Sequence, residues 1–306
     1  MKYPYLIIAS LFVFSFGCNT NTTDSPENEK PVVVATTSIV ADIAKNICSD
    51  FADVKSLMGP GVDPHLYKAS HGDIELLTNA DVVIYNGLHL EGKMSEILEK
   101  LKSSKTVIAV SDGVNDASIR TINEEADVHD PHIWFDVAIW SNGVRHVSES
   151  LKKKYPSHKD QIEKNTKTYL HAIDSVNKEC IKLVESLAIE KRILITSHDA
   201  FEYFGRSYDF KVRGLQGIST LSESGLKDVT DMVNFIIDNK IKAVFVENSV
   251  PQKALRSVID GCKAKGHDVT VGGELFSDAL GADRTPEGTY LGMIYFNVET
   301  VINGLK

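Results

Sequence analysis

Three short segments of this sequence set a histidine among aspartate, proline or serine, an arrangement that could bind a metal ion. Two of them repeat the tripeptide Asp-Pro-His, at residues 63–65 and 130–132, and the third is Ser197-His198-Asp199. A fourth segment, ELFSDALG at 274–281, offers a carboxylate. Imidazole suits zinc, copper, iron and nickel, and a carboxylate extends this set toward manganese. The candidate ligands of one divalent transition metal are His65, His132, His198 and Asp278.

Spacing alone leaves two interpretations of these histidines open. A single histidine is more often a surface or hydrogen-bonded core residue, and the chain has ten. Such ordinary roles are expected for His71, His89, His146, His158, His171 and His267. The repeated Asp-Pro-His is harder to explain in that way, because proline restricts the path of the chain and aspartate can hydrogen-bond an imidazole from outside a metal site.

The elements that would position these residues alternate between strand and helix. A β-branched run at 32–36 predicts a strand, and Ser38 is the expected N-cap of an amphipathic helix that extends to Ile47. Further strands are predicted at 53–58, 81–85, 106–110, 192–196, 211–215, 242–247 and 268–271, and helices at 70–79 and 93–102. In sheets of this kind ligands bind beyond the carboxyl ends of strands, where His65, His198 and Asp278 fall.

Residues 157–187 lack glycine and proline and carry apolar residues at helical spacing, which predicts one long helix. The predicted fold class is therefore α/β, with two lobes that each contain a mostly parallel sheet flanked by helices. The expected N-terminal lobe spans 31–156, the linking helix 157–187 and the C-terminal lobe 188–306. Each lobe would supply part of the metal site.

The first residues differ from the rest of the chain. Lys2 precedes an apolar run from Tyr5 to Phe16, which is shorter than the roughly 20 residues needed to span a bilayer. Residues 1–17 are predicted to be a signal peptide, Cys18 a lipidated cysteine, and 18–30 the anchor and its flexible tether. An ordinary cleaved signal is the alternative. Either way the protein is expected to be exported, and with lipidation it would be a membrane-anchored lipoprotein facing the periplasm or the extracellular side.

Charge and cysteine content exclude two other classes. The chain has 33 Lys and Arg against 42 Asp and Glu, a net charge of −9, and such a surface is a poor partner for nucleic acid. The cysteines beyond Cys18 are Cys48, Cys180 and Cys262, and none belongs to a CxxC pair. We expect them to be core residues and not a disulfide framework or a thiolate metal site.

Five segments resemble signature sequences of the cluster A-I (cluster 9) metal-binding receptors of ABC transporters: GVDPHLY, DPHIWFD, TSHDAFEYFGRSYDF, GIST and ELFSDALG. The resemblance covers residues 31–306. It implies that His65, His132, His198 and Asp278 are the metal ligands, two from each lobe, and that the long helix is a rigid connector. It also implies a monomer that serves an ABC permease and its ATPase subunit.

The resemblance leaves the metal open between manganese and zinc, with iron third. Members of the family carry either His or Glu at the position of His198, and Glu is associated with manganese receptors. Zinc-dedicated members carry a long His-rich loop ahead of the second ligand, whereas residues 123–130 are acidic and contain only His129. This loop could collect metal or could simply be a solvated acidic segment.

Three residues beside the ligands are candidates for supporting roles. Glu247 resembles an acidic residue close to the family's site, although it could instead cap the helix that follows Pro251. Trp134 and Phe201 flank ligands in the sequence and are expected to form a dry shell around the metal.

The chain is predicted not to be an enzyme. A catalytic zinc usually has three protein ligands and an open position for water, and Asp278 would fill that position. The HExxH and GxSxG motifs are absent from the sequence. A secreted zinc-dependent hydrolase and a surface adhesin-type lipoprotein are the alternatives to a transport receptor.

Overall fold

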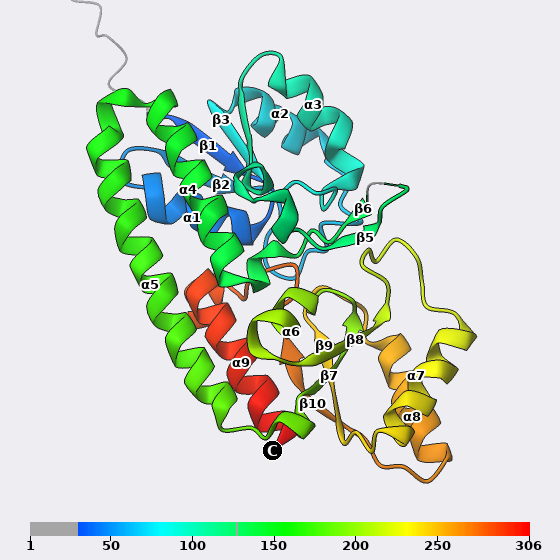
Figure 1. Ribbon diagram of the computed structural model, residues 1–306. Coiled ribbons are helices and arrows are strands. Elements are labelled where there is room, and N and C mark those ends of the chain that lie inside the picture. The colour runs from blue at the N-terminus through cyan, green and yellow to red at the C-terminus, as the bar shows by residue number, and fades with distance from the viewer. Residues whose placement is uncertain (1–29, 127) are drawn as a thin grey trace, which may run out of the picture.

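Two α/β lobes lie one above the other and are flanked along one side by a single long helix (Figure 1). This arrangement is seen in a computed structural model that describes residues 30–126 and 128–306. The predicted signal peptide (1–17), Cys18 and nearly all of the predicted tether (18–30) lie outside the described residues. Among the residues described, no helix has both the length and the apolar character to cross a membrane.

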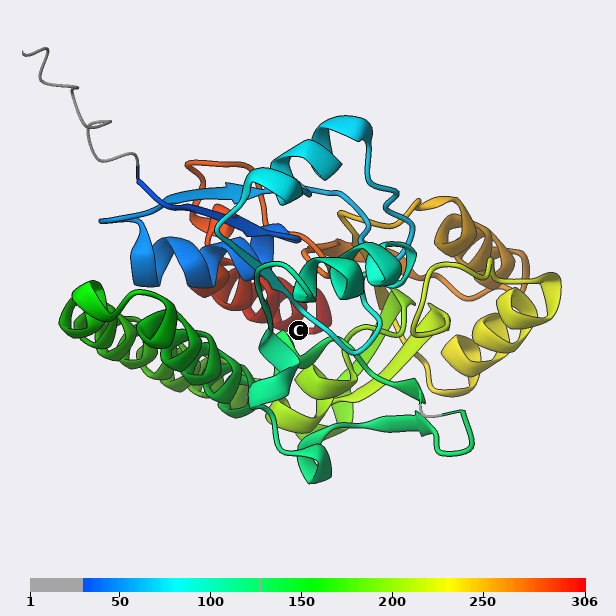
Figure 2. The ribbon, with the colours of Figure 1, turned by 90° about the horizontal axis from the view of Figure 1, so that it is seen from above.

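The N-terminal lobe contains a four-stranded parallel sheet in the order β2-β1-β3-β4. Its strands are β1 (Val32–Ala35), β2 (Asp53–Ser56), β3 (Val82–Tyr85) and β4 (Thr106–Ala109), and its helices are α1 (Ser38–Cys48), α2 (His71–Asn79), α3 (Ser95–Lys102) and α4 (Val137–Lys154). Alternate side chains point to opposite faces of the sheet. Val33 and Ile84 face α1 and α4, while Val34 and Val83 face α2 and α3. Figure 2 shows α1 and α2 on opposite sides of the strands.

The N-terminus of α1 differs by one residue from the prediction. Thr37, not Ser38, is the N-cap, and its hydroxyl accepts a hydrogen bond from the Val40 N–H at 3.2 Å. Both residues carry a hydroxyl that could cap a helix, so the sequence favoured neither strongly. Ser38 instead contacts the other lobe, where its hydroxyl accepts a hydrogen bond from the Leu280 N–H at 2.9 Å.

Helix α4 has no counterpart among the predicted elements. Gly143 lies in its interior and weakens the helical signal of the sequence. The structure explains the glycine, because a Cβ atom there would lie 2.5 Å from a methyl group of Val110. Glycine therefore lets α4 pack closely against the end of the N-terminal sheet.

The C-terminal lobe is built on four strands and four helices. The strands are β7 (Ile193–His198), β8 (Lys211–Gln216), β9 (Ala243–Glu247) and β10 (Thr270–Leu275), and the helices are α6 (Glu202–Tyr208), α7 (Leu226–Asp238), α8 (Lys253–Ala264) and α9 (Tyr290–Leu305). Strands β7 and β8 form one parallel pair and β9 and β10 another, and β7 packs beside β9. Strand β10 begins two residues later than predicted and has an irregular register next to Gly273. The predicted fold class is confirmed in both lobes.

The predicted acidic loop at 123–130 is part of a short antiparallel hairpin of β5 (Thr121–Asn123) and β6 (Val128–His129). The pattern of alternating strands and helices in the sequence does not predict this antiparallel hairpin. Short 3-10 segments complete the fold at Gly92–Met94, Val110–Gly113, Asp116–Ser118, Ile133–Phe135, Pro156–His158, Ile189–Lys191 and Pro286–Gly288.

The predicted long helix is α5 (Lys159–Glu185), which has 27 residues and is therefore about 40 Å long. It packs against α1 and α4 of the N-terminal lobe and against α9 of the C-terminal lobe (Figure 1). One buried apolar cluster runs from the N-terminal sheet past α5 into the C-terminal lobe, and it includes Trp140, Ile173, Phe204 and Tyr290. The two lobes consequently share a core and are not joined by a flexible hinge.

Candidate metal centre

The four candidate ligands converge at the interface of the lobes, two from each. His65 lies in the loop after β2, and His132 immediately precedes the Ile133–Phe135 turn. His198 is the last residue of β7, and Asp278 follows β10 by three residues. All four side chains are buried, with exposed fractions of 3% or less. Residues far apart in the sequence therefore meet in a site closed to water.

Their ligand atoms are spaced as a single small cation requires. The Nε2 atoms of His198, His132 and His65 lie 3.4, 3.5 and 4.0 Å from the nearer carboxylate oxygen of Asp278. One ligand atom from each of the four residues lies within 4.8 Å of all the others. A tetrahedral site with metal–nitrogen bonds of 2.0–2.1 Å places its ligand atoms about 3.3 Å apart. The observed set is slightly wider than this and could hold one divalent ion.

The hydrogen-bonding state of these atoms points to a cation. The Nε2 atoms of His65, His132 and His198 and the Oδ1 atom of Asp278 are buried, and none has a hydrogen-bond partner among the described residues. Buried polar atoms are nearly always hydrogen-bonded. Four unpaired atoms that face one another are explained if a metal ion is their common partner.

Asp130 orients the ring of His132. Its Oδ1 atom accepts hydrogen bonds from His132 Nδ1 at 2.7 Å and from the His132 backbone N–H at 3.0 Å. With the proton on Nδ1, the lone pair of Nε2 faces the centre of the site. In the second Asp-Pro-His motif, the aspartate thus fixes the tautomer of the histidine two residues later.

Glu247 performs the same task for His198. Its Oε2 atom lies 2.5 Å from His198 Nδ1, and its Oε1 atom accepts the His198 backbone N–H at 2.8 Å. Glu247 is the last residue of β9, which packs beside β7, so the two strand ends bring it to His198. The structure thus places Glu247 at the candidate site. Its carboxylate faces the imidazole and does not cap the helix after Pro251.

Burial and neighbouring charges set the protonation of the metal-free site. Burial lowers the pKa of His65 to about 3, so this imidazole is neutral. Burial also opposes protonation of His198, but the carboxylates of Glu247 and Asp278 outweigh it and hold the His198 pKa well above its ordinary value. Burial alone would raise the pKa of Asp278, yet the histidines, His198 foremost, lower it. Without metal, these shifts favour a protonated His198 beside an ionised Asp278.

The sequence matches the family described as "Zinc-uptake complex component A periplasmic" (ZnuA) over residues 33–304. The chain belongs to this family. The "manganese-binding lipoprotein MntA" of Bacillus subtilis is 45% identical to it over 290 residues, which cover 95% of this chain and 94% of the relative. The "zinc-binding protein TroA" of Treponema pallidum is also 45% identical, over 294 residues that cover 96% of this chain and 94% of the relative. The solved structure of Treponema pallidum TroA, a periplasmic zinc-binding protein, has a TM-score of 0.88 and 46% identity and covers 90% of this chain and 99% of that one. The resemblance to metal-binding receptors of ABC transporters is confirmed.

The aromatic residues predicted around the site take two different places in this ZnuA-family fold. Trp134 lies edge-on to His132, with ring centroids 5.3 Å apart, and its indole N–H donates to the carbonyl of Ser277 in the other lobe at 3.0 Å. Phe201 stacks on Phe135 at 4.5 Å. Trp134 therefore contacts a candidate ligand, whereas Phe201 belongs to the apolar layer between the lobes.

Two further residues shape the site without an obvious sequence signal. The Ser249 hydroxyl donates to Asp278 Oδ2 at 3.3 Å and contacts the Ser277 hydroxyl at 2.9 Å. Gly214 of β8 lies against the end of β7, where a Cβ atom would be 2.5 Å from the carbonyl carbon of His198. Only glycine lets the two strands approach closely enough here. Neither position has a residue type that marks metal chemistry, so only the fold could identify it.

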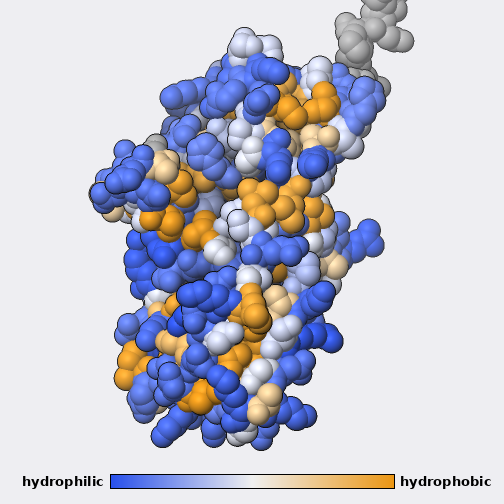
Figure 3. Space-filling view, turned by 90° about the vertical axis from the view of Figure 1, so that its right-hand side faces the viewer, coloured by the Kyte–Doolittle hydropathy of each residue, from blue (hydrophilic) through white to orange (hydrophobic). Residues whose placement is uncertain are grey.

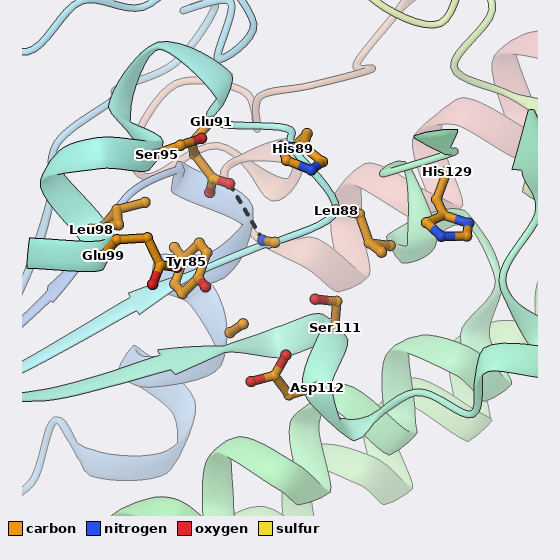
Figure 4. A pocket seen from close by; sticks show the side chains of 12 residues that line it. Tyr85, Leu88, His89, Glu91, Ser95, Leu98, Glu99, Ser111, Asp112 and His129 are labelled. Atoms are coloured by element: carbon orange, nitrogen blue, oxygen red, sulfur yellow. Dashed lines mark hydrogen bonds between the residues drawn. The ribbon is translucent and has the colours of Figure 1, made fainter. Parts of the chain in front are cut away.

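A cavity of about 380 Å³ lies at the carboxyl ends of β3 and β4 (Figure 4), and none of the four candidate ligands lines it. The buried Glu91 beside it accepts hydrogen bonds from the Thr36 hydroxyl at 2.6 Å and the Asn86 backbone N–H at 2.8 Å. The Asn86 side chain in turn donates to the Pro131 carbonyl at 2.9 Å. The Asn86 side chain thus links the residues around the cavity to the second Asp-Pro-His turn.

Proposed function

We propose that this chain is the extracytoplasmic substrate-binding subunit of an ABC importer and that it captures one divalent transition metal, manganese or zinc. The observation that carries this proposal is the set of four buried, mutually facing atoms with no hydrogen-bond partner among the described residues. We assign the ligand role to His65, His132, His198 and Asp278. Relatives of equal identity are named for manganese and for zinc, which supports either metal as the cargo.

The donor set favours capture over catalysis. Four protein ligands saturate a tetrahedral ion and leave no position for the activated water that a zinc hydrolase needs. The relatives' names describe metal binding and transport, not hydrolysis. We therefore propose that the protein is not an enzyme, and no observation favours the hydrolase or the adhesin alternative.

A receptor of this class requires a permease and an ATPase subunit, and we propose these as partners. We further propose that the protein is an exported monomer held at the membrane by lipid on Cys18, since the Bacillus subtilis relative is named a lipoprotein. On the face drawn in Figure 3, apolar side chains form separate groups among hydrophilic ones. The predicted divisions into lobes at 31–156 and 188–306 with helix 157–187 between them remain part of this proposal.

Calorimetric titration of the metal-free protein tests the proposal. We expect one tight equivalent of zinc per chain and weaker binding of manganese, because affinities of nitrogen-rich sites are higher for zinc. Two tight equivalents, or the absence of tight binding by either ion, would contradict a single transport site.

Metal binding is expected to release a proton near pH 7. The raised pKa of His198 keeps that imidazole protonated in the metal-free protein, whereas a metal needs it neutral. Below the His198 pKa, lowering the pH increases the fraction of protein in which zinc must displace the His198 proton, so zinc affinity should fall. Above this pKa, His198 is already neutral and zinc affinity should level off. Titration in two buffers of different ionisation enthalpy measures the protons released. A value of zero at pH 7 would show that His198 is neutral without metal.

Replacing Cys18 with serine is expected to leave the protein exported but to move it from the membrane to the soluble fraction. Serine cannot receive the lipid, and stable anchoring depends on more than one acyl chain. Fractionation followed by a high-salt wash measures the outcome. Retention of the Cys18→Ser protein on washed membranes would rule out Cys18 as the anchor.

A further inference from the structure

The aspartate of each Asp-Pro-His motif lies between a candidate ligand and the opposite lobe. We propose that Asp63 and Asp130 couple retention of the metal to the contacts between the lobes, and that Thr220 and Arg120 are the positioning residues that complete these two connections. This inference rests on the proposed function. It concerns how long a bound metal stays in the site, and not which metal is bound.

The first connection joins His65 to the loop between β8 and α7. Asp63 Oδ1 accepts a hydrogen bond from the His65 backbone N–H at 2.8 Å, and Asp63 Oδ2 accepts one from the Thr220 hydroxyl at 2.6 Å. Asp63 belongs to the N-terminal lobe and Thr220 to the C-terminal lobe, 157 residues away. A movement of the loop that carries Thr220 therefore acts directly on the carboxylate that holds the backbone of His65.

The second connection joins His132 to the start of α6. Asp130 Oδ1 holds the ring of His132, and Asp130 Oδ2 lies 3.3 Å from Arg120 Nη1. The same guanidinium lies 3.6 Å from Asp199 Oδ2 and 3.9 Å from Glu202 Oε1, both in the C-terminal lobe. One planar cation thus bridges carboxylates of both lobes, and one of them orients a candidate ligand.

Tyr203 of α6 reinforces the second connection through the backbone. Its hydroxyl accepts the Arg120 backbone N–H at 2.9 Å and donates to the Asp130 carbonyl at 3.2 Å. Arg120 therefore contacts the C-terminal lobe through both its side chain and its backbone N–H. Asp130 contacts the same lobe through its carbonyl, which accepts the Tyr203 hydroxyl. A movement of α6 relative to the N-terminal lobe would therefore act first on Asp130, and through Asp130 on His132.

The two connections involve different ligands and share no residue. Metal ligands lose affinity when the groups that orient them are removed, by roughly 10–100-fold. Movement of the loop that carries His65 or His132 away from the ligands of the other lobe would strain the Asp63–Thr220 hydrogen bond or the Arg120 bridge. Weakening either connection should therefore speed release while leaving all four ligands in place.

The test is the dissociation rate of zinc from full-length protein, measured by transfer to a coloured chelator. Thr220→Val removes the hydroxyl but keeps a branched side chain, and we expect release about tenfold faster, at the low end of the range for outer hydrogen-bond partners. Thr220→Ser keeps the hydroxyl and should restore the slow rate. Thr168→Val, which removes an exposed hydroxyl from α5, is the matched control and should change nothing.

Arg120→Lys provides an independent variant if Thr220→Val fails to fold. Lysine keeps the charge but lacks the planar fork that reaches two carboxylates at once, so zinc should again dissociate faster. Arg145→Lys on the exposed face of α4 is its control. Unchanged dissociation in both Thr220→Val and Arg120→Lys, or release from Thr220→Ser as fast as from Thr220→Val, would overturn the inference. Failure of the unmodified protein to bind zinc would instead overturn the proposed function.

Discussion

Zinc affinity is expected to fall by well over 100-fold when Asp278 is replaced with asparagine, since loss of an outer hydrogen-bond partner alone costs roughly 10–100-fold. Asp278 supplies the one anionic donor among the four, and its oxygens lie within 4.0 Å of all three Nε2 atoms. Asparagine would remove the negative charge in a fully buried site, where neither water nor another carboxylate among the candidate ligands can replace it. Competition titration against a chelator of known affinity measures the loss.

The control for this substitution is His171→Ala, which removes an exposed histidine from α5. Its zinc affinity should equal that of the unmodified protein. Metal-dependent thermal stabilisation should disappear in Asp278→Asn and persist in the control, because a ligand stabilises a fold only to the extent that it binds the folded state. An Asp278→Asn protein that binds zinc as tightly as the control would remove Asp278 from the ligand set.

Glu247→Gln is expected to weaken zinc binding nearly as much, although Glu247 does not face the metal. Its two oxygens accept hydrogen bonds from the His198 backbone N–H and from Nδ1. Glutamine has a single oxygen, so its amide group must face one of these two partners. If the amide faces Nδ1, the imidazole must carry its proton on Nε2, the atom that would bind the metal. We expect a loss at the upper end of the roughly 10–100-fold range for outer partners.

A matched control for Glu247→Gln is Asp42→Asn. Asp42 is also buried and accepts hydrogen bonds from the Tyr169 hydroxyl and the Asn46 side chain, but it does not contact a candidate ligand. Both variants should lower the free energy of unfolding, and only Glu247→Gln should change the ring-nitrogen chemical shifts of His198. Equal zinc affinity in the two variants would show that Glu247 acts on stability alone.

Much of the fold could be predicted because local patterns and tertiary structure agree. The β-branched run at 32–36 became β1, and the predicted linking helix 157–187 differs from α5 by two residues at each end. Helix α4 could not be predicted, because Gly143 lowers the helical propensity of this segment. The glycine is required by close packing against Val110, which the sequence does not reveal. The N-cap of α1 was assigned to Ser38 because Thr37 and Ser38 are chemically equivalent there.

The candidate site was predictable to the extent that residue type reveals function. Histidines beside Asp-Pro and a carboxylate after a strand suggested a metal, and the resemblance to metal receptors selected the four. Thr220 and Arg120 could not be identified, because their roles depend on partners in the opposite lobe. The Thr220–Asp63 contact spans 157 residues, and threonine has no chemistry that marks it as part of a metal site. Such residues become visible only when the lobes are assembled.

The rigidity that helix α5 gives the molecule affects how loaded and empty copies compete for the permease. Because this helix packs on both lobes and a common core continues across them, empty and loaded copies should have nearly the same outline. A permease that recognises outline would then accept both, and empty copies would occupy its docking sites without delivering anything. We expect transport to slow when the protein is produced in large excess over available metal. The abundance of such a rigid carrier would therefore have an optimum, set by how often it arrives loaded.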